Sequence, residues 1–202
     1  MREVKTIQTD SENLIIIQKS KFFAFSYFVD CEGKVQEILN SLRKKYYDAT
    51  HICYAFNINS KQKCSDDKEP QGTAGKPILD CIQKKKLDNV LVVVVRYFGG
   101  IKLGAGGLTR AYSNSASEIL AMSGLKEIQE CTLIKFAIVP SEIKFVELIK
   151  KMAGVRLAKT EFGEQIVVQV ICEKENKQNV IQNINNIFCR DINILSSKEI
   201  FF

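Results

Sequence analysis

The chain has 202 residues, of which 46% are hydrophobic and 26% charged, with three prolines, eleven glycines and a net charge of +6. This composition excludes a disordered, collagenous or disulfide-stapled chain, and the length allows a sizeable core in one large domain or two small ones. The seven cysteines are an odd number, and no two lie closer than eleven positions. That spacing excludes a zinc knuckle and a CxxC pair, so we expect reduced thiols in a cytoplasmic protein.

The positive charge is unevenly distributed along the chain. Residues 1–126 hold 19 Lys and Arg against 13 Asp and Glu, whereas residues 127–202 hold ten of each. A mildly basic part beside a neutral part suggests that the first meets a polyanion, although +6 is also an ordinary solubility charge. The N-terminus lacks the apolar stretch of a signal peptide, and the longest aliphatic run, 90–95, is too short to cross a bilayer. We therefore expect no membrane association.

The first elements follow from hydrophobic periodicity. Strands are expected at 4–9, 14–18 and 22–29. A helix is expected over 33–47, where apolar residues recur every three or four positions, and a strand over 51–58, where they alternate. Residues 59–71 show no periodicity, which predicts a mobile loop.

The next two helices flank a strand. One helix is expected from Thr73, with Pro77 in its first turn and the basic residues Lys84–Lys86 at its C-terminus. Residues 90–97 are apolar on both faces, which predicts a central strand. After a glycine-rich loop, a further helix is expected from Leu108 to Met122.

The last 75 residues have a strand, helix, strand, strand, helix, strand order, expected at 128–139, 141–153, 155–162, 165–173, 176–188 and 192–200. This βαββαβ order is typical of the ferredoxin-like fold. The sequence therefore predicts an α+β protein of two domains, 1–126 and 127–202.

The strongest chemical signal is a run with five glycines within nine residues, 99–107. Glycines cost backbone entropy, so either a tight turn against a neighbouring element or the approach of an anion to backbone N–H groups must require them. The run fits neither a P-loop nor a dinucleotide fingerprint, which favours a phosphodiester backbone or an acidic protein surface. The candidate anion-binding or nucleic-acid-binding residues are Arg96, Gly99, Gly100, Lys102, Gly104, Gly106, Gly107, Thr109, Arg110 and Lys76.

A second signal is the acidic run with Asp66, Asp67 and Glu69. Three carboxylates in four residues suit Mg²⁺ or Ca²⁺, but the calcium-loop spacing is absent, so a solvated acidic loop is favoured and no metal or cofactor is expected. Thr73 is expected to cap the following helix.

His51 is the only histidine, so any histidine-dependent catalysis must use it. On its strand face it would meet Asp66 or Asp67 across a cleft as a general base, or else be a half-buried strand residue. No nucleophile signature is present, so the residues give little support for an enzyme.

Three segments resemble the IMPACT/YigZ family: 49–55 (Ala-Thr-His-Ile-Cys-Tyr-Ala), 65–79 and 89–112. Lys68 departs from the pattern, because the family usually has glycine there, and this puts a positive-φ turn in the acidic run in doubt. The resemblance implies a first domain similar to the second domain of a small-subunit ribosomal protein. It also implies a ferredoxin-like second domain similar to the C-terminal domain of the translocation elongation factor.

Three functions remain open. The resemblance and the basic loop favour a regulatory or binding protein that contacts RNA, the ribosome or a translation factor. The alternatives are an enzyme acting on a small phosphorylated or peptide substrate through His51 and the acidic run, and a pure protein-interaction module. The oligomeric state is not predicted.

Overall fold

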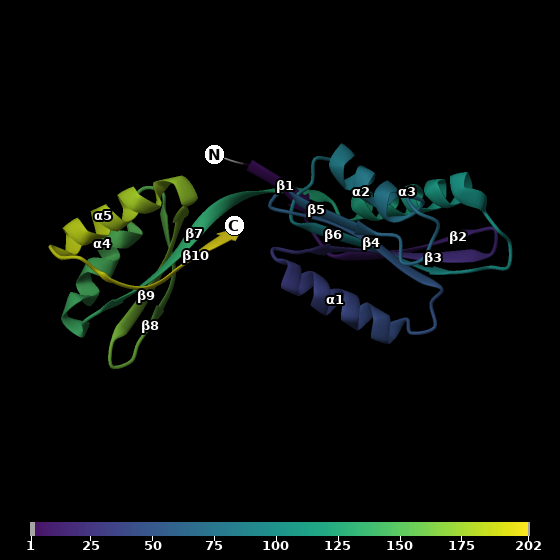
Figure 1. Cartoon of the computed structure of the whole chain (residues 1–202). Helices are drawn as coiled ribbons and strands as arrows, with labels where there is room; N and C mark the ends of the chain where they lie inside the picture. Colours follow the sequence, from purple (N-terminus) through teal and green to yellow (C-terminus); the bar gives the residue numbers. More distant parts are fainter. Residues whose placement is uncertain (1–2, 202) are drawn as a thin grey trace. The chain divides into compact units, whose positions relative to one another are not determined.

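The computed structural model describes residues 3–201. These divide into two compact units, of which the first is Val4–Glu127 and the second contains residues 128–201 together with Glu3. The protein is of the α+β class and contains two five-stranded sheets whose registered strand pairs are antiparallel (Figure 1). Within the described residues, no helix is both long and apolar enough to cross a membrane.

The first unit is built on a sheet with the strand order β2-β3-β6-β4-β5. Its elements are β1 (Glu3–Ile7), β2 (Ser11–Ile17), β3 (Ser20–Phe28), α1 (Glu32–Lys45), β4 (His51–Ile58), β5 (Lys61–Ser65), α2 (Gly75–Lys84), β6 (Val90–Tyr97) and α3 (Gly104–Met122). The central place expected for residues 90–97 is confirmed. β1 pairs with β7 (Leu125–Ile138), whose first three residues belong to this unit.

The expectation of a structureless loop over 59–71 is wrong for its first part. Residues Lys61–Ser65 form the edge strand β5, which pairs with β4 from Ile58↔Lys61 to Tyr54↔Ser65. Four of its five residues are exposed, so it carries no apolar alternation, and lysines are common on such edges. The periodicity that reveals strands depends on a buried face, which this strand lacks.

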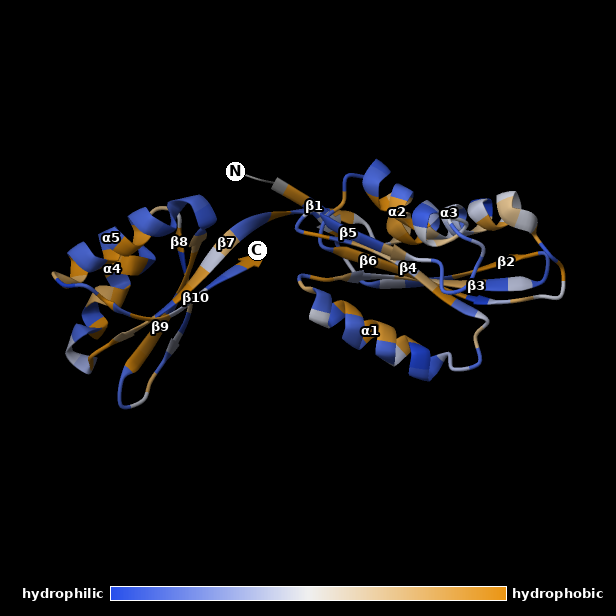
Figure 2. Cartoon of the chain, in the orientation of Figure 1, coloured by the Kyte–Doolittle hydropathy of each residue, from blue (hydrophilic) through white to orange (hydrophobic). Residues whose placement is uncertain are grey.

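Helices cover both faces of this sheet. Helix α1 lies on one face, and α2 and α3 lie on the other, each with its apolar side turned to the strands (Figures 1 and 2). The odd-numbered residues of β6, such as Val93, join the core under α1, and the even-numbered ones, such as Val92, join the core under α2 and α3. This alternation explains why β6 is apolar at six consecutive positions.

The second unit has the element order expected from the sequence. Its elements are the remainder of β7, a 3₁₀ turn η1 (Pro140–Phe145) continuing into α4 (Val146–Lys150), β8 (Val155–Glu161), β9 (Ile166–Glu173), a 3₁₀ turn η2 (Lys174–Asn176), α5 (Lys177–Phe188) and β10 (Asn193–Phe201). The strands β10, β7, β9 and β8 lie side by side in that order. Their core contains Phe136, Val168 and Phe188.

Candidate anion-binding site at the start of helix α3

The register of the central strands brings the lone histidine beside an arginine. His51 on β4 is the direct partner of Arg96 on β6, and Arg96 is the direct partner of Phe22 on β3. Arg96 has the same parity as Val92 and Val94, so it lies on the sheet face that α2 and α3 cover. Directly paired residues of neighbouring strands share a face, so the side chains of His51 and Arg96 lie side by side on this face of the sheet.

Glu69 forms an ion pair with Arg96. The Nη1 atom of Arg96 donates to Glu69 Oε1 at 2.6 Å, and the hydroxyl of Tyr112 donates to the same oxygen at 2.8 Å. Arg96 and Glu69 are only 5% and 7% exposed, and burial raises the pKa of Tyr112, which therefore stays a neutral donor. The positive charge expected from Arg96 is thus largely compensated inside the protein.

The carboxylate beside His51 differs from the one expected. The Nε2 atom of His51 lies 3.8 Å from Glu69 Oε1, whereas Asp67 meets the ring only through its main-chain oxygen, 2.8 Å from Nδ1. A carbonyl oxygen can only accept, so Nδ1 carries the proton in the neutral ring and Nε2 holds the lone pair. The expected pairing of His51 with the carboxylate of Asp66 or Asp67 is therefore wrong.

The side chains of Asp66 and Asp67 organise the backbone instead. Asp66 accepts hydrogen bonds from the backbone N–H groups of Gly72, Ala74 and Gly75 at 2.8–3.0 Å, and Asp67 Oδ2 accepts from Ile52 N at 2.6 Å. Burial raises the pKa of the Asp66 carboxyl, but these hydrogen bonds lower it by more, so the pKa lies below its usual value. The acidic run is thus an ordered element rather than a solvated loop.

Asp66 also takes the capping role expected of Thr73. Helix α2 begins after Ala74, and Asp66 binds the first free N–H groups of the helix from eight and nine residues upstream. The Thr73 hydroxyl points elsewhere and donates to the carbonyl of Pro70 at 2.6 Å. A cap so distant in sequence could not be seen by local pattern, because capping rules compare positions within one turn.

The turn at Lys68 keeps a backbone conformation that favours glycine. Lys68 has φ of +69° and Asp67 has φ of +41°. The doubt raised by a lysine at this position is resolved, since the positive-φ turn forms with lysine in place. A residue that has a Cβ atom adopts this left-handed conformation at a cost of the order of 1–2 kcal/mol.

The glycines of the 99–107 run have different physical reasons. A Cβ on Gly99 would lie 2.0 Å from the backbone carbon of Lys19, so this glycine is required by close packing of the chain. Gly100 and Gly104 have φ of +86° and +69°. Gly106 is exposed, has no positive φ, and a Cβ there would meet nothing within 4 Å. The explanation by a tight turn against a neighbouring element is therefore confirmed for Gly99, whereas the fold gives no reason for Gly106, and the approach of an anion stays a prediction.

The exposed start of helix α3 provides backbone donors. No side chain within the described part of the chain caps this helix, and its first turn holds no acidic residue. Its first N–H groups and the positive end of its dipole therefore remain available to an anion. Lys102 lies two positions before the first residue of the helix. It is exposed and forms no ion pair with another residue of the described range.

A pocket of about 390 Å³ opens beside this helix start. It has a polar side with His51, Glu69 and Arg96, and an apolar side that includes Phe98. The complete lining is Thr50, His51, Glu69, Pro70, Arg96, Phe98, Lys102, Leu103, Gly104, Ala105 and Leu108. The structure thus brings His51, Arg96, Lys102 and Gly104 together.

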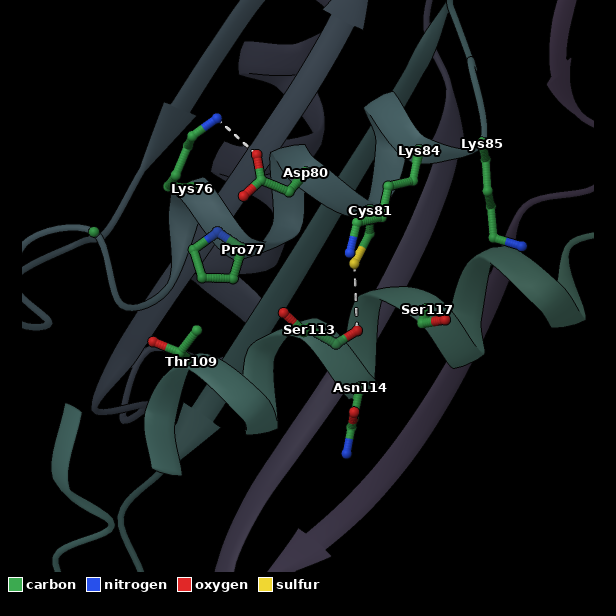
Figure 3. Close-up of a pocket in the computed structure, with 11 residues that line it drawn as sticks. Lys76, Pro77, Asp80, Cys81, Lys84, Lys85, Thr109, Ser113, Asn114 and Ser117 are labelled. Atoms are coloured by element: carbon green, nitrogen blue, oxygen red, sulfur yellow. Dashed lines mark hydrogen bonds and ion pairs between the residues drawn. The ribbon is translucent and has the colours of Figure 1, made fainter. Parts of the chain in front are cut away.

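Two of the expected anion-binding residues line a different hollow. Lys76 and Thr109 lie in a groove between α2 and α3, also of about 390 Å³, together with Lys84 and Lys85 (Figure 3). Lys76 is paired there with Asp80 at 2.6 Å. Arg110 is exposed on α3 and lines neither hollow.

Glu69 and Tyr112 are the site residues that the sequence reasoning missed. The sequence places Glu69 only in an acidic run, and Tyr112 only in an expected helix and in a family segment. The family motifs contain both, but their connection depends on the folded sheet. Among residues 3–201, no group of three or more His, Cys, Asp or Glu side chains is arranged to hold a metal ion.

Comparison with known proteins identifies the family of this chain. Residues 18–120, about half of the chain, match the Impact N-terminal domain. The chain belongs to the IMPACT family. The resemblance seen in the sequence is therefore confirmed, and its motifs contain the residues of the pocket.

Bacterial members of the IMPACT family are similar to this chain over different lengths. The family member YvyE of Bacillus subtilis is 45% identical over 125 residues, which cover 60% of this chain and 58% of YvyE. A member from Haemophilus influenzae is 31% identical over 163 residues, 78% of this chain and 68% of that protein. The chain thus spans little more than half the length of YvyE in that match. A crystal structure of a hypothetical protein has the same fold, with a TM-score of 0.71, 22% identity, and coverage of 97% and 98% of the two chains.

Proposed function

We propose that this protein is a regulatory or binding protein linked to translation, and that its first domain binds single-stranded RNA at the start of helix α3. The observation that carries the proposal is the uncapped N-terminus of α3 beside the unpaired Lys102. Backbone N–H groups and a lysine together bind phosphate without reading sequence. The glycine at position 106, which the fold does not require, leaves the helix surface open to such a group.

Phe98 supports a single strand rather than a duplex. This side chain is 47% exposed, and the guanidinium of Arg96 lies under its ring at 5.6 Å from the centroid. Exposed aromatic rings beside positive charge are the stacking platforms of proteins that bind single strands, and a base in a duplex cannot reach them. Phe98 would stack a base whose phosphate lies on the helix start.

The domain assignment belongs to the same proposal. We propose two domains, 1–126 and 127–202, the first similar to the second domain of a small-subunit ribosomal protein and the second ferredoxin-like. The sheet order of the second unit supports the latter name, because its first and third strands, β7 and β9, lie between the fourth and second. Both likenesses are consistent with an RNA or ribosome partner, but a fold alone does not determine function.

The experiment is fluorescence anisotropy of a labelled mixed-sequence single-stranded RNA at about 50 and 200 mM salt. Wild type is compared with Lys102→Ala/Arg110→Ala. The matched control is Arg43→Ala/Lys44→Ala. It also removes one arginine and one lysine, but from exposed positions on α1, on the other face of the sheet. We expect binding that weakens with salt, is lost in the first variant and persists in the control. Binding that both variants weaken equally would show only a general charge effect and would contradict the site.

Gly106→Ala tests the helix start without changing charge. Apart from the neighbouring backbone of its own helix, the added methyl meets nothing within 4 Å, so the fold should tolerate it. A phosphate that contacts the first N–H groups of α3 would be obstructed, so RNA affinity should fall by about tenfold or more while the protein stays folded. Unchanged affinity would remove the helix start from the site.

A second candidate function, an enzyme acting on a small phosphorylated substrate, rests on His51. Its Nδ1–H is held by the Asp67 carbonyl at 2.8 Å, and the ring lines the pocket. A ring fixed in this way suits a general base that takes a proton from water as the water attacks phosphorus. The protonated ring then gives this proton to the leaving oxygen, which departs as an alcohol when its P–O bond breaks. Release of inorganic phosphate from a 5′-phosphorylated oligonucleotide, abolished by His51→Gln, would support it. If neither RNA binding nor turnover is found, recovery of a translation factor in a nuclease-treated pull-down would favour a protein-interaction module.

A further inference from the structure

Polar groups from three separate parts of the chain line the pocket beside α3. His51 lies on β4, Arg96 on β6, and Lys102 just before α3. The charge of Arg96 is balanced by Glu69, whereas Lys102 is exposed. Polar groups that converge on one pocket are typical of a ligand site, and this observation is independent of the helix N-terminus.

The other polar groups of the pocket also favour an anion. Lys102 and the first N–H groups of α3 supply positive charge and donors, and the one carboxylate, Glu69, already accepts hydrogen bonds from Arg96 and Tyr112. The anion that suits such a set carries several oxygens and a high charge. A phosphate monoester has three terminal oxygens and a charge of about −1.5 to −2 near pH 7, against −1 for an internal phosphodiester.

His51 adds a reason to prefer the monoester. With Nδ1–H held by the Asp67 carbonyl, Nε2 offers a lone pair when the ring is neutral and an N–H when it is protonated. A phosphate monoester carries a proton on part of its molecules near neutral pH, because its second pKa is about 6. A proton shared between the monoester and Nε2 of His51 would form a hydrogen bond between them. An internal phosphodiester carries no such proton.

The size and apolar wall of the pocket limit what accompanies the phosphate. About 390 Å³ is at the small end of ligand pockets, and Pro70, Phe98, Leu103 and Leu108 line its apolar side. This space suits one nucleotide rather than a run of several. From a bound terminal nucleotide the RNA chain leaves the pocket in one direction, whereas from a bound internal nucleotide it must leave in two. A small pocket therefore suits a terminal nucleotide.

We propose that this pocket receives the terminal phosphate monoester of a single RNA strand, with the terminal nucleotide against the apolar wall. The inference rests on the proposed RNA binding and makes it specific, because the protein would recognise strand ends that carry a phosphate. The 5′ and 3′ ends offer the same chemistry and are separated by experiment.

The test uses one eight-nucleotide RNA in three forms: 5′-phosphorylated, 3′-phosphorylated and unphosphorylated, each labelled at a distance from the tested end. An unphosphorylated RNA one nucleotide longer is the control for charge, since it carries one additional internal phosphate. We expect one of the two phosphorylated forms to bind at least tenfold more tightly than both controls. Equal binding of all four RNAs would overturn the terminal-phosphate inference and leave RNA binding standing, whereas no binding of any RNA would overturn both.

Three variants locate the preference in the pocket. Lys102→Ala and His51→Asn should reduce the preference for the phosphorylated end to less than about threefold. The Asn amide retains a donor near the position of Nδ1 for the Asp67 carbonyl but has no counterpart of Nε2. Lys84→Ala, in the groove between α2 and α3, removes a lysine outside the pocket and should keep the preference. Because Lys102 is exposed, its variant is expected to fold even if His51→Asn does not. A preference that survives Lys102→Ala would overturn the assignment to this pocket.

Discussion

Arg96 and Glu69 form a buried ion pair, with Nη1 and Oε1 2.6 Å apart, across 27 positions of sequence. The pair connects the end of the central strand to the acidic run and forms one wall of the pocket. Glu69 also accepts from Tyr112, so one carboxylate joins a strand, a loop and helix α3. Because both charges are almost completely removed from water, each depends on the other.

Removing the charge of Glu69 should therefore be costly. Glu69→Gln keeps the shape of the side chain but leaves the Arg96 guanidinium buried without a counter-ion, so we expect a loss of about 3–5 kcal/mol in unfolding free energy. Urea unfolding followed by circular dichroism measures it. The matched control is Glu32→Gln, which breaks the exposed pair with Lys61 and should cost less than about 1 kcal/mol. Similar small losses for both variants would show that the buried pair contributes little.

Asp66 should stabilise the first unit in a pH-dependent way. Its pKa in the folded protein is below the usual value, so its contribution is fully present above the unfolded pKa of about 3.9 and is lost as pH falls through the folded pKa. At pH 7, Asp66→Ala should cost about 2 kcal/mol, because three backbone donors lose their acceptor.

Asp66→Asn separates the charge from the hydrogen bonds. Its side-chain oxygen can still accept from Ala74 and Gly75, which both bind Oδ1, but it loses the bond from Gly72 to Oδ2. Its loss of stability should lie between wild type and Asp66→Ala at pH 7, and the difference from wild type should close below about pH 4. Denaturation midpoints between pH 3 and 7 measure it, and a difference independent of pH would contradict the role of the charge.

Lys68→Gly should stabilise the protein. The lysine has φ of +69°, a region that costs an L-residue about 1–2 kcal/mol, and the greater backbone freedom of glycine when unfolded offsets part of the gain. We expect a net increase of about 0.5–1 kcal/mol in unfolding free energy. Glu37→Gly, at an exposed position in the middle of α1, should lose a similar amount. A loss in both variants would argue against strain at Lys68.

Gly99→Ala and Gly106→Ala should change stability in opposite directions. A methyl group on Gly99 would enter the backbone at Lys19, so a loss of about 1–3 kcal/mol is expected from the forced shift. At Gly106, in the first turn of α3, alanine should add about 0.5–1 kcal/mol. Thermal unfolding of the two variants decides whether the glycine run has one structural cause or two.

Lys76 and Lys102 should differ in their effect on RNA binding. Lys102→Ala removes an unpaired charge at the pocket, so the slope of log affinity against log salt should become shallower by about 0.7–1. Lys76 is paired with Asp80 and lines the other hollow, so Lys76→Ala should leave the slope unchanged. Equal changes would place the RNA across both hollows.

Much of the architecture could be predicted from the sequence, because it depends on local patterns. The helix over Glu32–Lys45, the central strand Val90–Tyr97 and the order of elements in the second unit follow from periodicity and apolar runs. The edge strand Lys61–Ser65 could not be found in this way, because its side chains are exposed and its order comes from pairing with β4.

The candidate site shows the same division. The sequence by itself determined which segments carry chemistry: the glycine-rich run, the acidic run, the lone histidine and the family to which they belong. Only the tertiary structure decided how these residues are used, because charge compensation and capping act over distances of a few ångströms in space and not along the chain. Strand register placed His51 beside Arg96. Folding of the chain then paired Arg96 with Glu69, brought Asp66 to the start of α2, and left Lys102 exposed beside the uncapped start of α3.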